Sequence, residues 1–279
     1  MEITFTVDWL HVNEPFAPYA LPSSHMMNIP GLNRISPCTP RHGYTEAFTN
    51  QAGCQVMRNP NRSDMGVHVS YSGKTLNTYR DNDLDPLGIV RWHLHRKGNV
   101  TRIDLAFDMR DSGLHPSTLY GMLDRKQAKT TAKTYNLIVG NDGGATLYIG
   151  SRQSEAFLRI YDKGIESGDG GDWIRVELEL KASKAQFAAY TMANEPDSRA
   201  YQWAQAWLNG FVAFDCHEWI VLMTTTAIPL ARANKPEKDT RKWLLEQVAP
   251  AMARYMARTG DYKLLTDFMA IIRSGEPID

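Results

Sequence analysis

Three segments of the chain alternate between apolar and polar residues at every second position. They read TRIDLAFD, LRIYDK and IRVELELK, and they begin at residues 101, 158 and 174. Because successive side chains of a β-strand point to opposite faces, each segment would form a strand with one apolar and one charged face. Antiparallel sheets commonly have one buried and one polar face. This pattern constrains the fold more than any other feature, and it predicts an antiparallel sheet with a strongly charged side.

Strand-like and helix-like segments are grouped along the chain instead of alternating strictly. Short strand-like runs fill much of the first 80 residues, and more strands are expected between residues 134 and 181. A helix is predicted from Asp85 to Gly98, because Asp85 suits the N-cap, Pro86 the first turn and Gly98 the C-terminal stop. Further helices are expected over residues 116–129, 183–194, 198–212, 239–258 and 261–273.

This grouping predicts an α+β fold with antiparallel sheets and flanking helices. We expect a strand-rich region over residues 1–182 and a helical C-terminal region over 183–279 that packs on it. A weak internal similarity points to two related halves. The segment TVDWL at residues 6–10 resembles TRIDLA at 101–106, and several hairpin-like strands follow each of them.

The bulk composition limits how such a chain could bind its partners. Lys+Arg and Asp+Glu both number 31, so the net charge is zero and any binding to nucleic acid must come from local basic segments. Two such segments, residues 91–102 and 124–133, are equally consistent with solvated surfaces. We see no signal peptide and no apolar run long enough for a membrane span. The three cysteines fit neither a disulfide framework nor a zinc site, so we expect a reduced, cytoplasmic protein.

The charged faces of the three strands would collect chemistry if the strands pair in one sheet. They carry Arg102, Asp104, Asp108, Arg159, Tyr161, Lys163, Arg175, Glu177, Glu179 and Lys181. One interpretation is a solvated face on which opposite charges pair across strands. In the other, carboxylates two and four residues apart hold a divalent cation beside a tyrosine nucleophile, and the cations grip a phosphate. The sequence alone leaves both interpretations open.

The three motifs together resemble the trans-acting replication initiators of rolling-circle plasmids and filamentous phages, and the related relaxases of conjugative elements. The resemblance is most specific between residues 85 and 182, where TRIDLAFD, TLYIGSRQSEAFLRIYDKGIE and WIRVELELK follow one another. It implies two sheets with flanking helices in a horseshoe-like arrangement. By this resemblance Tyr161 matches the nucleophile. The matching acidic positions are Asp104, Asp108 and Glu177, and the basic ones are Lys163 and Arg175.

The resemblance implies an enzyme that nicks and rejoins one DNA strand through a 5′-phosphotyrosine intermediate and needs Mg²⁺ or Mn²⁺. We expect Asp104 and Glu177 to hold the metal, with Asp108 or Glu179 completing the site, and Arg159, Lys163 and Arg175 to act on the phosphate. The expected partner is origin DNA, single-stranded or in a hairpin. A host helicase and a homodimer stay open. Alternative functions are a conjugative relaxase and a non-catalytic DNA-binding protein of the same fold.

Two further features of the sequence are considered as site residues. His93 and His95 form a His-Leu-His pattern that would suit a metal on a strand, but both fall inside the predicted helix. Residues two apart on a helix point about 200° from one another and cannot share one ion. We therefore do not expect a metal at this pair. Tyr148 is the reserve candidate for the nucleophile, in case Tyr161 is not used.

Overall fold

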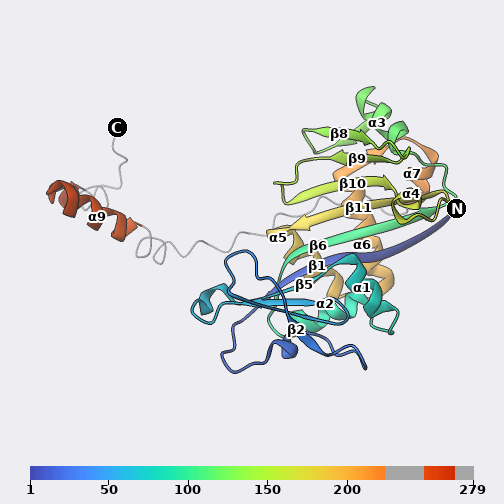
Figure 1. Ribbon diagram of the computed structural model, residues 1–279. Coiled ribbons are helices and arrows are strands. Elements are labelled where there is room, and N and C mark those ends of the chain that lie inside the picture. Colours follow the sequence, from blue (N-terminus) through green and yellow to red (C-terminus); the bar gives the residue numbers. More distant parts are fainter. Residues whose placement is uncertain (224–247, 268–279) are drawn as a thin grey trace. The chain divides into compact units, whose positions relative to one another are not determined.

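The computed structural model describes residues 1–223 and 248–267 (Figure 1). Residues 1–233 form one compact unit and residues 234–279 a second, and each is described by itself. The second unit contains α9 (Ala249–Thr259), which matches the later part of the predicted helix 239–258. The earlier part of that helix, and residues 268–273 of the last predicted helix, lie outside the described residues. The predicted division at residue 182 stays a prediction.

Ten strands of the first unit form one antiparallel sheet, in the order β2-β3-β4-β5-β1-β6-β11-β10-β9-β8. Their bounds are β1 Glu2–Glu14, β2 Ile35–Pro37, β3 Glu46–Asn50, β4 Gln55–Arg58, β5 Val67–Tyr71, β6 Asn99–Arg110, β8 Tyr135–Val139, β9 Ala145–Ile149, β10 Ala156–Asp162 and β11 Trp173–Lys181. A small second sheet pairs β7 (Ala128–Thr130) with β12 (Val212–Phe214). The predicted α+β class with antiparallel sheets is confirmed.

Helices of the first unit lie between and after the strands of each half, and α5 and α6 cover one face of the sheet. The helices are η1 Pro22–His25, η2 Ser63–Met65, α1 Gly73–Arg80, α2 Pro86–His95, α3 Pro116–Asp124, α4 Lys163–Ser167, α5 Ala182–Ala193, α6 Asp197–Phe211 and α7 His217–Leu222. In Figure 1, α5 and α6 lie behind β6 and β11. We call the opposite side of the sheet, which carries Tyr161 and Arg175, the polar face. Within the described residues, no helix is both long and apolar enough to cross a bilayer.

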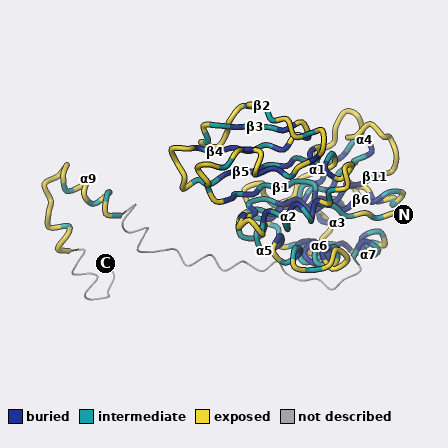
Figure 2. The backbone as a smooth tube through the Cα atoms, turned by 90° about the horizontal axis from the view of Figure 1, so that it is seen from below, coloured by how far each residue is buried: buried dark blue, intermediate teal, exposed yellow. Residues whose placement is uncertain are grey.

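The sheet consists of two halves with the same topology, as the internal similarity of the sequence predicted. In the first half, β1 leads into a meander whose last strand, β5, returns to pair with β1. In the second half, β6 leads into a meander whose last strand, β11, returns to pair with β6. The pairing of β1 with β6 joins the halves into one sheet. Strands β2 to β5 overlap in Figure 1 but spread out in Figure 2, so the two halves are turned relative to one another.

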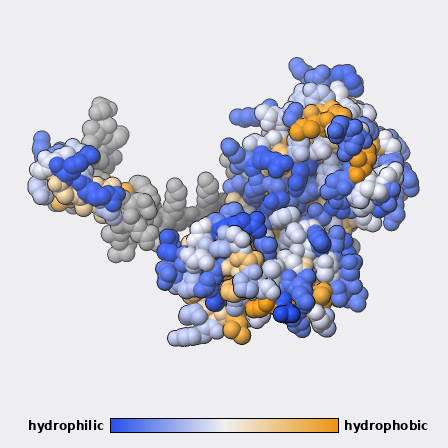
Figure 3. Space-filling model, in the orientation of Figure 1, coloured by the Kyte–Doolittle hydropathy of each residue, from blue (hydrophilic) through white to orange (hydrophobic). Residues whose placement is uncertain are grey.

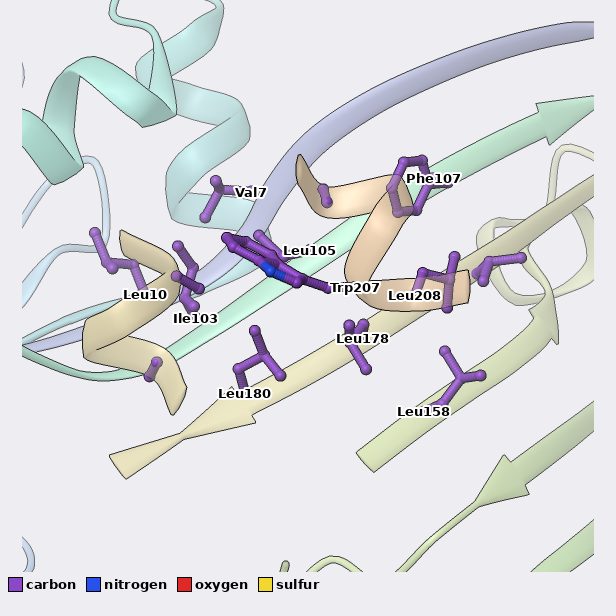
Figure 4. Packing of buried hydrophobic residues seen from close by; sticks show 14 of the residues in the cluster. Val7, Leu10, Ile103, Leu105, Phe107, Leu158, Leu178, Leu180, Trp207 and Leu208 are labelled. Carbon is purple, nitrogen blue, oxygen red and sulfur yellow. The ribbon is translucent and has the colours of Figure 1, made fainter. Parts of the chain in front are cut away.

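The apolar face of the sheet forms the core together with α6. Leu105, Leu158 and Leu178 come from three neighbouring strands and are fully buried. Trp207 and Leu208 of α6 lie against this face (Figure 4). The alternation predicted from the sequence is thus the reason why this helix layer packs on one face only.

Two predicted helices end differently in the structure. The helix expected over 116–129 stops at Asp124, because Lys126 adopts a left-handed φ of 58° and the chain then enters β7. The helix predicted up to Gly98 ends at His95, and the left-handed residue is Lys97 with a φ of 61°. Gly98 is needed for space instead, since an added Cβ would lie 2.7 Å from the carbonyl oxygen of His93.

A buried carboxylate, Glu14 at the end of β1, holds three segments together on the helix-covered side. Its oxygens accept hydrogen bonds from His93 of α2 (2.7 Å), from Arg96 (3.0 and 3.2 Å) and from His25 of η1. Burial alone would raise the pKa of the Glu14 carboxyl, but these hydrogen bonds outweigh burial and hold its pKa well below the ordinary value. His93 is therefore a structural residue on a helix, as predicted, while His95 is exposed.

Replacing the Glu14 carboxylate should show how much the stability of the protein depends on it. Glu14→Gln should lower the free energy of unfolding at pH 7 by about 3 kcal/mol or more, because a neutral amide replaces the buried carboxylate that accepts from His25, His93 and Arg96. A carboxyl whose folded pKa is depressed stabilises the protein above its ordinary pKa of about 4.3, and this contribution is lost as the pH falls. In urea unfolding between pH 7 and pH 3, the free energy of unfolding should fall less steeply with pH for the variant than for the wild-type protein. The half-buried pair of Glu46 with Arg58 gives the control Glu46→Gln, and equal slopes in both variants would contradict this role of Glu14.

Candidate functional site

A cleft of about 710 Å³ opens on the polar face of the sheet, beside the first turn of α1. Five of the eight predicted site residues line it: Arg159, Tyr161, Lys163, Arg175 and Glu177. In Figure 3, hydrophilic side chains cover this face over β10 and β11. The residues that the sequence grouped by parity are therefore brought together at one hollow in the surface.

Strand register explains why these side chains meet. Across β6, β11 and β10, Asp108 stands opposite Arg175, which stands opposite Tyr161. In the next row on this face, Glu177 stands opposite Arg159. Directly opposed side chains on one face of an antiparallel sheet are close enough to interact. The register alone thus places the phenol, the two arginines and the carboxylates within reach of one another.

The central carboxylates share one arginine. Nη2 of Arg159 donates to Oδ2 of Asp104 at 3.1 Å and also to Oε1 of Glu177. Arg102 binds Asp104 through two hydrogen bonds of 2.9 and 2.6 Å. Glu179 pairs with Arg102 at 2.9 Å. Burial raises the pKa of Asp104, against the opposing effect of Arg102. Burial and the nearby Asp104 raise the pKa of Glu177 to about 8, although Arg159 opposes this.

The hydroxyl of Tyr161 points to this carboxylate cluster. It donates a hydrogen bond of 3.2 Å to Oε2 of Glu177. Burial and the neighbouring Glu177 raise the pKa of the phenol well above its ordinary value, although Arg175 opposes this shift. Tyr161 is therefore protonated at neutral pH, and its hydroxyl is hydrogen-bonded to the group whose carboxylate form would accept its proton. The arrangement suits a nucleophile that is activated at the moment of attack.

Arg175 is held by two carboxylates on either side. Its guanidinium binds Asp108 through hydrogen bonds of 2.8 and 2.7 Å, and binds Asp8 of β1 at 2.7 Å. The sequence analysis missed Asp8 as a site residue. The register of β1 on β6 shifts between Val7 and Trp9, and such a bulge re-aims a side chain. The available signal was the similarity of TVDWL to TRIDLA, which matches Asp8 with Asp104.

Two predicted residues differ from their expected positions or roles. Lys163 is not on the strand with Tyr161: β10 ends at Asp162, whose side chain accepts a hydrogen bond from the backbone of Ile165 and starts α4. Lys163 still faces the cleft, with Nζ 5.8 Å from the centre of the Tyr161 ring. Tyr148, the reserve nucleophile, stacks on Phe157 at 5.7 Å, outside this cleft.

The donor set of the site suits a hard divalent cation. Asp104 and Glu177 are buried, supply oxygen ligands and already converge on one positive nitrogen, that of Arg159. Their raised pKa values show that burial leaves their negative charge incompletely compensated. As the side chains stand, residues 1–223 and 248–267 contain no group of three His, Cys, Asp or Glu that could hold an ion. Asp104 and Glu177 therefore fit a metal if Arg159 gives way.

A family model described as Replication initiation factor matches residues 98–270, which is more than half of the 279 residues. The chain belongs to the replication initiation factor family. The match begins just before β6, so it spans the half of the sheet that carries the eight predicted site residues. The family predicted from the three sequence motifs is confirmed.

Two known proteins and one solved structure are similar to this chain. The "Putative DNA relaxase NicK" of Bacillus subtilis (strain 168) is 27% identical over 218 residues, which are 67% of this chain and 60% of that protein. A "Replication initiation protein" of Staphylococcus aureus is 38% identical over 96 residues, which are 31% of this chain and 27% of that protein. This chain therefore spans 60% or less of the length of these curated relatives. The "Rolling Circle Replication Initiator Protein from Geobacillus stearothermophilus" shares the fold with a TM-score of 0.67, at 20% identity over 83% of this chain and 99% of that one.

The ion pairs of Arg175 with Asp8 and Asp108 should contribute measurably to the free energy of unfolding. Arg175→Met removes one cation and leaves the largely buried Asp8 and Asp108 without it, so the free energy of unfolding should fall by about 3–5 kcal/mol. The matched control is Arg110→Met on the neighbouring strand, whose partner Asp169 and own side chain are exposed. That variant should change stability by about 1 kcal/mol or less. Urea unfolding of both variants tests the contrast, and equal losses would show that the Arg175 cluster is an ordinary surface pair.

Proposed function

We propose that this member of the replication initiation factor family cuts one DNA strand and joins its 5′ phosphate to Tyr161. The hydrogen bond from Tyr161 to Glu177, inside a cleft lined by five cationic side chains, carries this proposal. It supplies a nucleophile, a proton acceptor and positive charge within one site. The resemblance to relaxases and rolling-circle initiators supports DNA as the substrate. A host helicase and a second copy of the chain remain predicted partners.

In the proposed first step, the phenolic oxygen of Tyr161 attacks the phosphorus of a phosphodiester, and its proton passes to Glu177. The new O–P bond forms as the bond from phosphorus to the 3′ oxygen breaks, and the departing 3′ oxygen takes up a proton from the solvent. Because the pKa of Glu177 is about 8, its carboxylate form becomes the major form as the pH rises through that value. Rejoining is the reverse: the 3′ hydroxyl attacks the phosphotyrosine, and Tyr161 regains its proton.

The cations have separate tasks in this proposal. Arg175 is held by Asp8 and Asp108, so its guanidinium is already in position beside the phenol and need not move. It would lower the cost of negative charge on the attacking oxygen. Lys163 and Arg159 line the cleft and would contact the phosphate oxygens. Mg²⁺ or Mn²⁺ held by Asp104 and Glu177, with Glu179 beside them, would polarise the phosphodiester. Glu179 pairs with Arg102 and Lys181, but it stands directly opposite Asp104, whereas Asp108 is bonded to Arg175 one row away, which favours Glu179 as the third acidic residue.

Two other functions are alternatives to this proposal, and the first has support from a relative. The relaxase of Bacillus subtilis matches two thirds of this chain, so a conjugative relaxase with the same chemistry is the closest alternative. A non-catalytic DNA-binding protein of this fold is the second. The covalent adduct separates the second alternative from the proposal, because only an enzyme of this type forms it.

Tyr161→Phe should abolish the covalent adduct while the fold and DNA binding are kept, because only a hydroxyl is lost. Incubation with origin-containing single-stranded DNA and Mn²⁺, followed by mass mapping of the modified peptide, measures this directly. Tyr148→Phe is the matched control, since Tyr148 lies outside the cleft, and it should form the adduct at the wild-type rate. An adduct mapped to Tyr148 in the wild-type protein would overturn the assignment of the nucleophile.

Asp104→Asn and Glu177→Gln should both lose cleavage by a hundredfold or more, a loss on the order of those seen when one charge-stabilising group is removed. Neither should recover at high Mn²⁺ concentration, because the ligand charge itself is missing. Both keep the side-chain shape, so circular dichroism should show a folded protein. The competing interpretation is that these carboxylates only pair with Arg102 and Arg159. Near-normal nicking by both variants at limiting Mn²⁺ would favour that interpretation.

A further inference from the structure

The polar face of the N-terminal half occupies the same topological position as the candidate site. Trp9 of β1 pairs with Asp104 of β6 at the centre of the sheet. Counted outward from that pair, β1, β5 and β4 correspond to β6, β11 and β10. The row Asp108–Arg175–Tyr161 of the second half then corresponds to Asn13–His68–Met57 of the first. In the adjacent row, Ser70 and Gln55 take the places of Glu177 and Arg159. Each group that carries the proposed chemistry is thus replaced by a side chain that is neutral.

This second face carries rings instead of charges. We call Trp9, His11, His42, Tyr44 and His68 the aromatic row. Nε1 of Trp9 donates to Nε2 of His11 at 2.7 Å, and the His11 ring lies 4.9 Å from that of His68. The rings of Tyr44 and His42 lie 6.0 and 6.4 Å from His68. The row begins at Trp9, which lines the cleft, so the two surfaces are continuous.

The charges around the aromatic row suit a negatively charged strand whose bases are unpaired. From Trp9 outward, the residues of β1, β3, β4 and β5 on this face include no Asp or Glu. Arg102 lies 4.8 Å over the Trp9 ring at one end, and exposed Arg41, which donates to Gln55, lies at the other. Burial and neighbouring cations lower the pKa of His11 to about 3 and that of His68 to about 4. Both imidazoles are therefore neutral, flat rings at pH 7.

We infer that the aromatic row binds the single-stranded DNA that continues from the cleft. Bases would stack on the exposed ring of His42 and the half-buried rings of Tyr44 and Trp9, with buried His68 supporting them from below, while Arg41 and Arg102 contact phosphates. The inference rests on the proposed function for the identity of the ligand. Aromatic side chains interleaved with cations are the surface that binds unpaired strands without strong sequence preference. A duplex would keep its bases stacked inside and could not use the rings. The N-terminal half would then share the topology of the half that carries Tyr161, but it would bind the strand without cutting it.

The test measures how affinity depends on strand length in the nicking-inactive Tyr161→Phe background. Fluorescence anisotropy is recorded with thymidylate oligonucleotides of about 4 and about 16 nucleotides, the range of site sizes for such surfaces. The double variant His42→Asn/Tyr44→Ala removes two rings, and Asn tolerates the left-handed φ of 58° at residue 42. It should bind the long strand about 5- to 100-fold more weakly and leave binding of the short strand unchanged.

The matched control is Tyr190→Ala, which removes an exposed ring from α5 on the helix-covered side. It should bind both strands as the parent protein does. Three results would overturn the inference: no gain in affinity with length in the parent protein, an unchanged affinity of the double variant for the long strand, or a duplex that binds as tightly as the single strand. Adduct mapping at Tyr161 is a separate readout. A missing adduct with retained length dependence would reject the nicking proposal alone.

Discussion

The polar face of this sheet can exist only because each of its buried carboxylates has an arginine beside it. Asp104, Glu177 and Glu179 meet Arg102 and Arg159, while Asp8 and Asp108 meet Arg175. Removing ions from water is expensive unless partners of opposite charge and hydrogen bonds replace the solvent. The compensation is uneven, since the pKa of Asp104 and Glu177 is raised by burial while Arg175 is fully bonded. The site thus combines a rigid cation beside the phenol with a carboxylate pair that retains affinity for positive charge.

The two halves of the sheet show how one topology can carry two surfaces. Strand order and pairing are the same in both, and the apolar faces pack on helices in the same way. The polar faces differ at each position of the two rows compared, where ionisable side chains in one half stand against neutral ones in the other. A sheet face on the solvent side contributes little to the core, so its residues can diverge without loss of the fold. The bulge at Asp8 and Trp9 gives a side chain to each surface, because Asp8 serves Arg175 and Trp9 starts the aromatic row.

Much of the fold and part of the site could be predicted from the sequence, for physical reasons that differ between residues. Alternation over 101–108, 158–162 and 174–181 predicted the strands and their faces, and therefore the placement of Tyr161 with Arg159 and Glu177. The signals at Asp85 and Pro86 placed α2, which removed His93 from the list of metal ligands. Partners across strands could not be predicted, since they depend on strand order.

The errors of the sequence analysis also have local causes. Asp8 was missed because a bulge changes the register within β1. Lys163 was placed on a strand because alternation continues past Asp162, although the side chain of Asp162 caps a helix there. Lys126 adopts a left-handed conformation that no sequence pattern marks, and so the end of α3 was placed too late.

The central position of β1 affects how the chain must be synthesised and folded. This strand comprises residues 2–14, yet one of its edges is completed by β5 at residues 67–71 and the other by β6 at residues 99–110. Closing such long loops is slow, because their entropy is lost before the contacts form. An unpaired strand edge with apolar neighbours is also prone to pairing with other chains. During translation, β1 therefore keeps a free edge until residue 110 has left the ribosome, and the nascent N-terminal half is the part of the chain most exposed to aggregation.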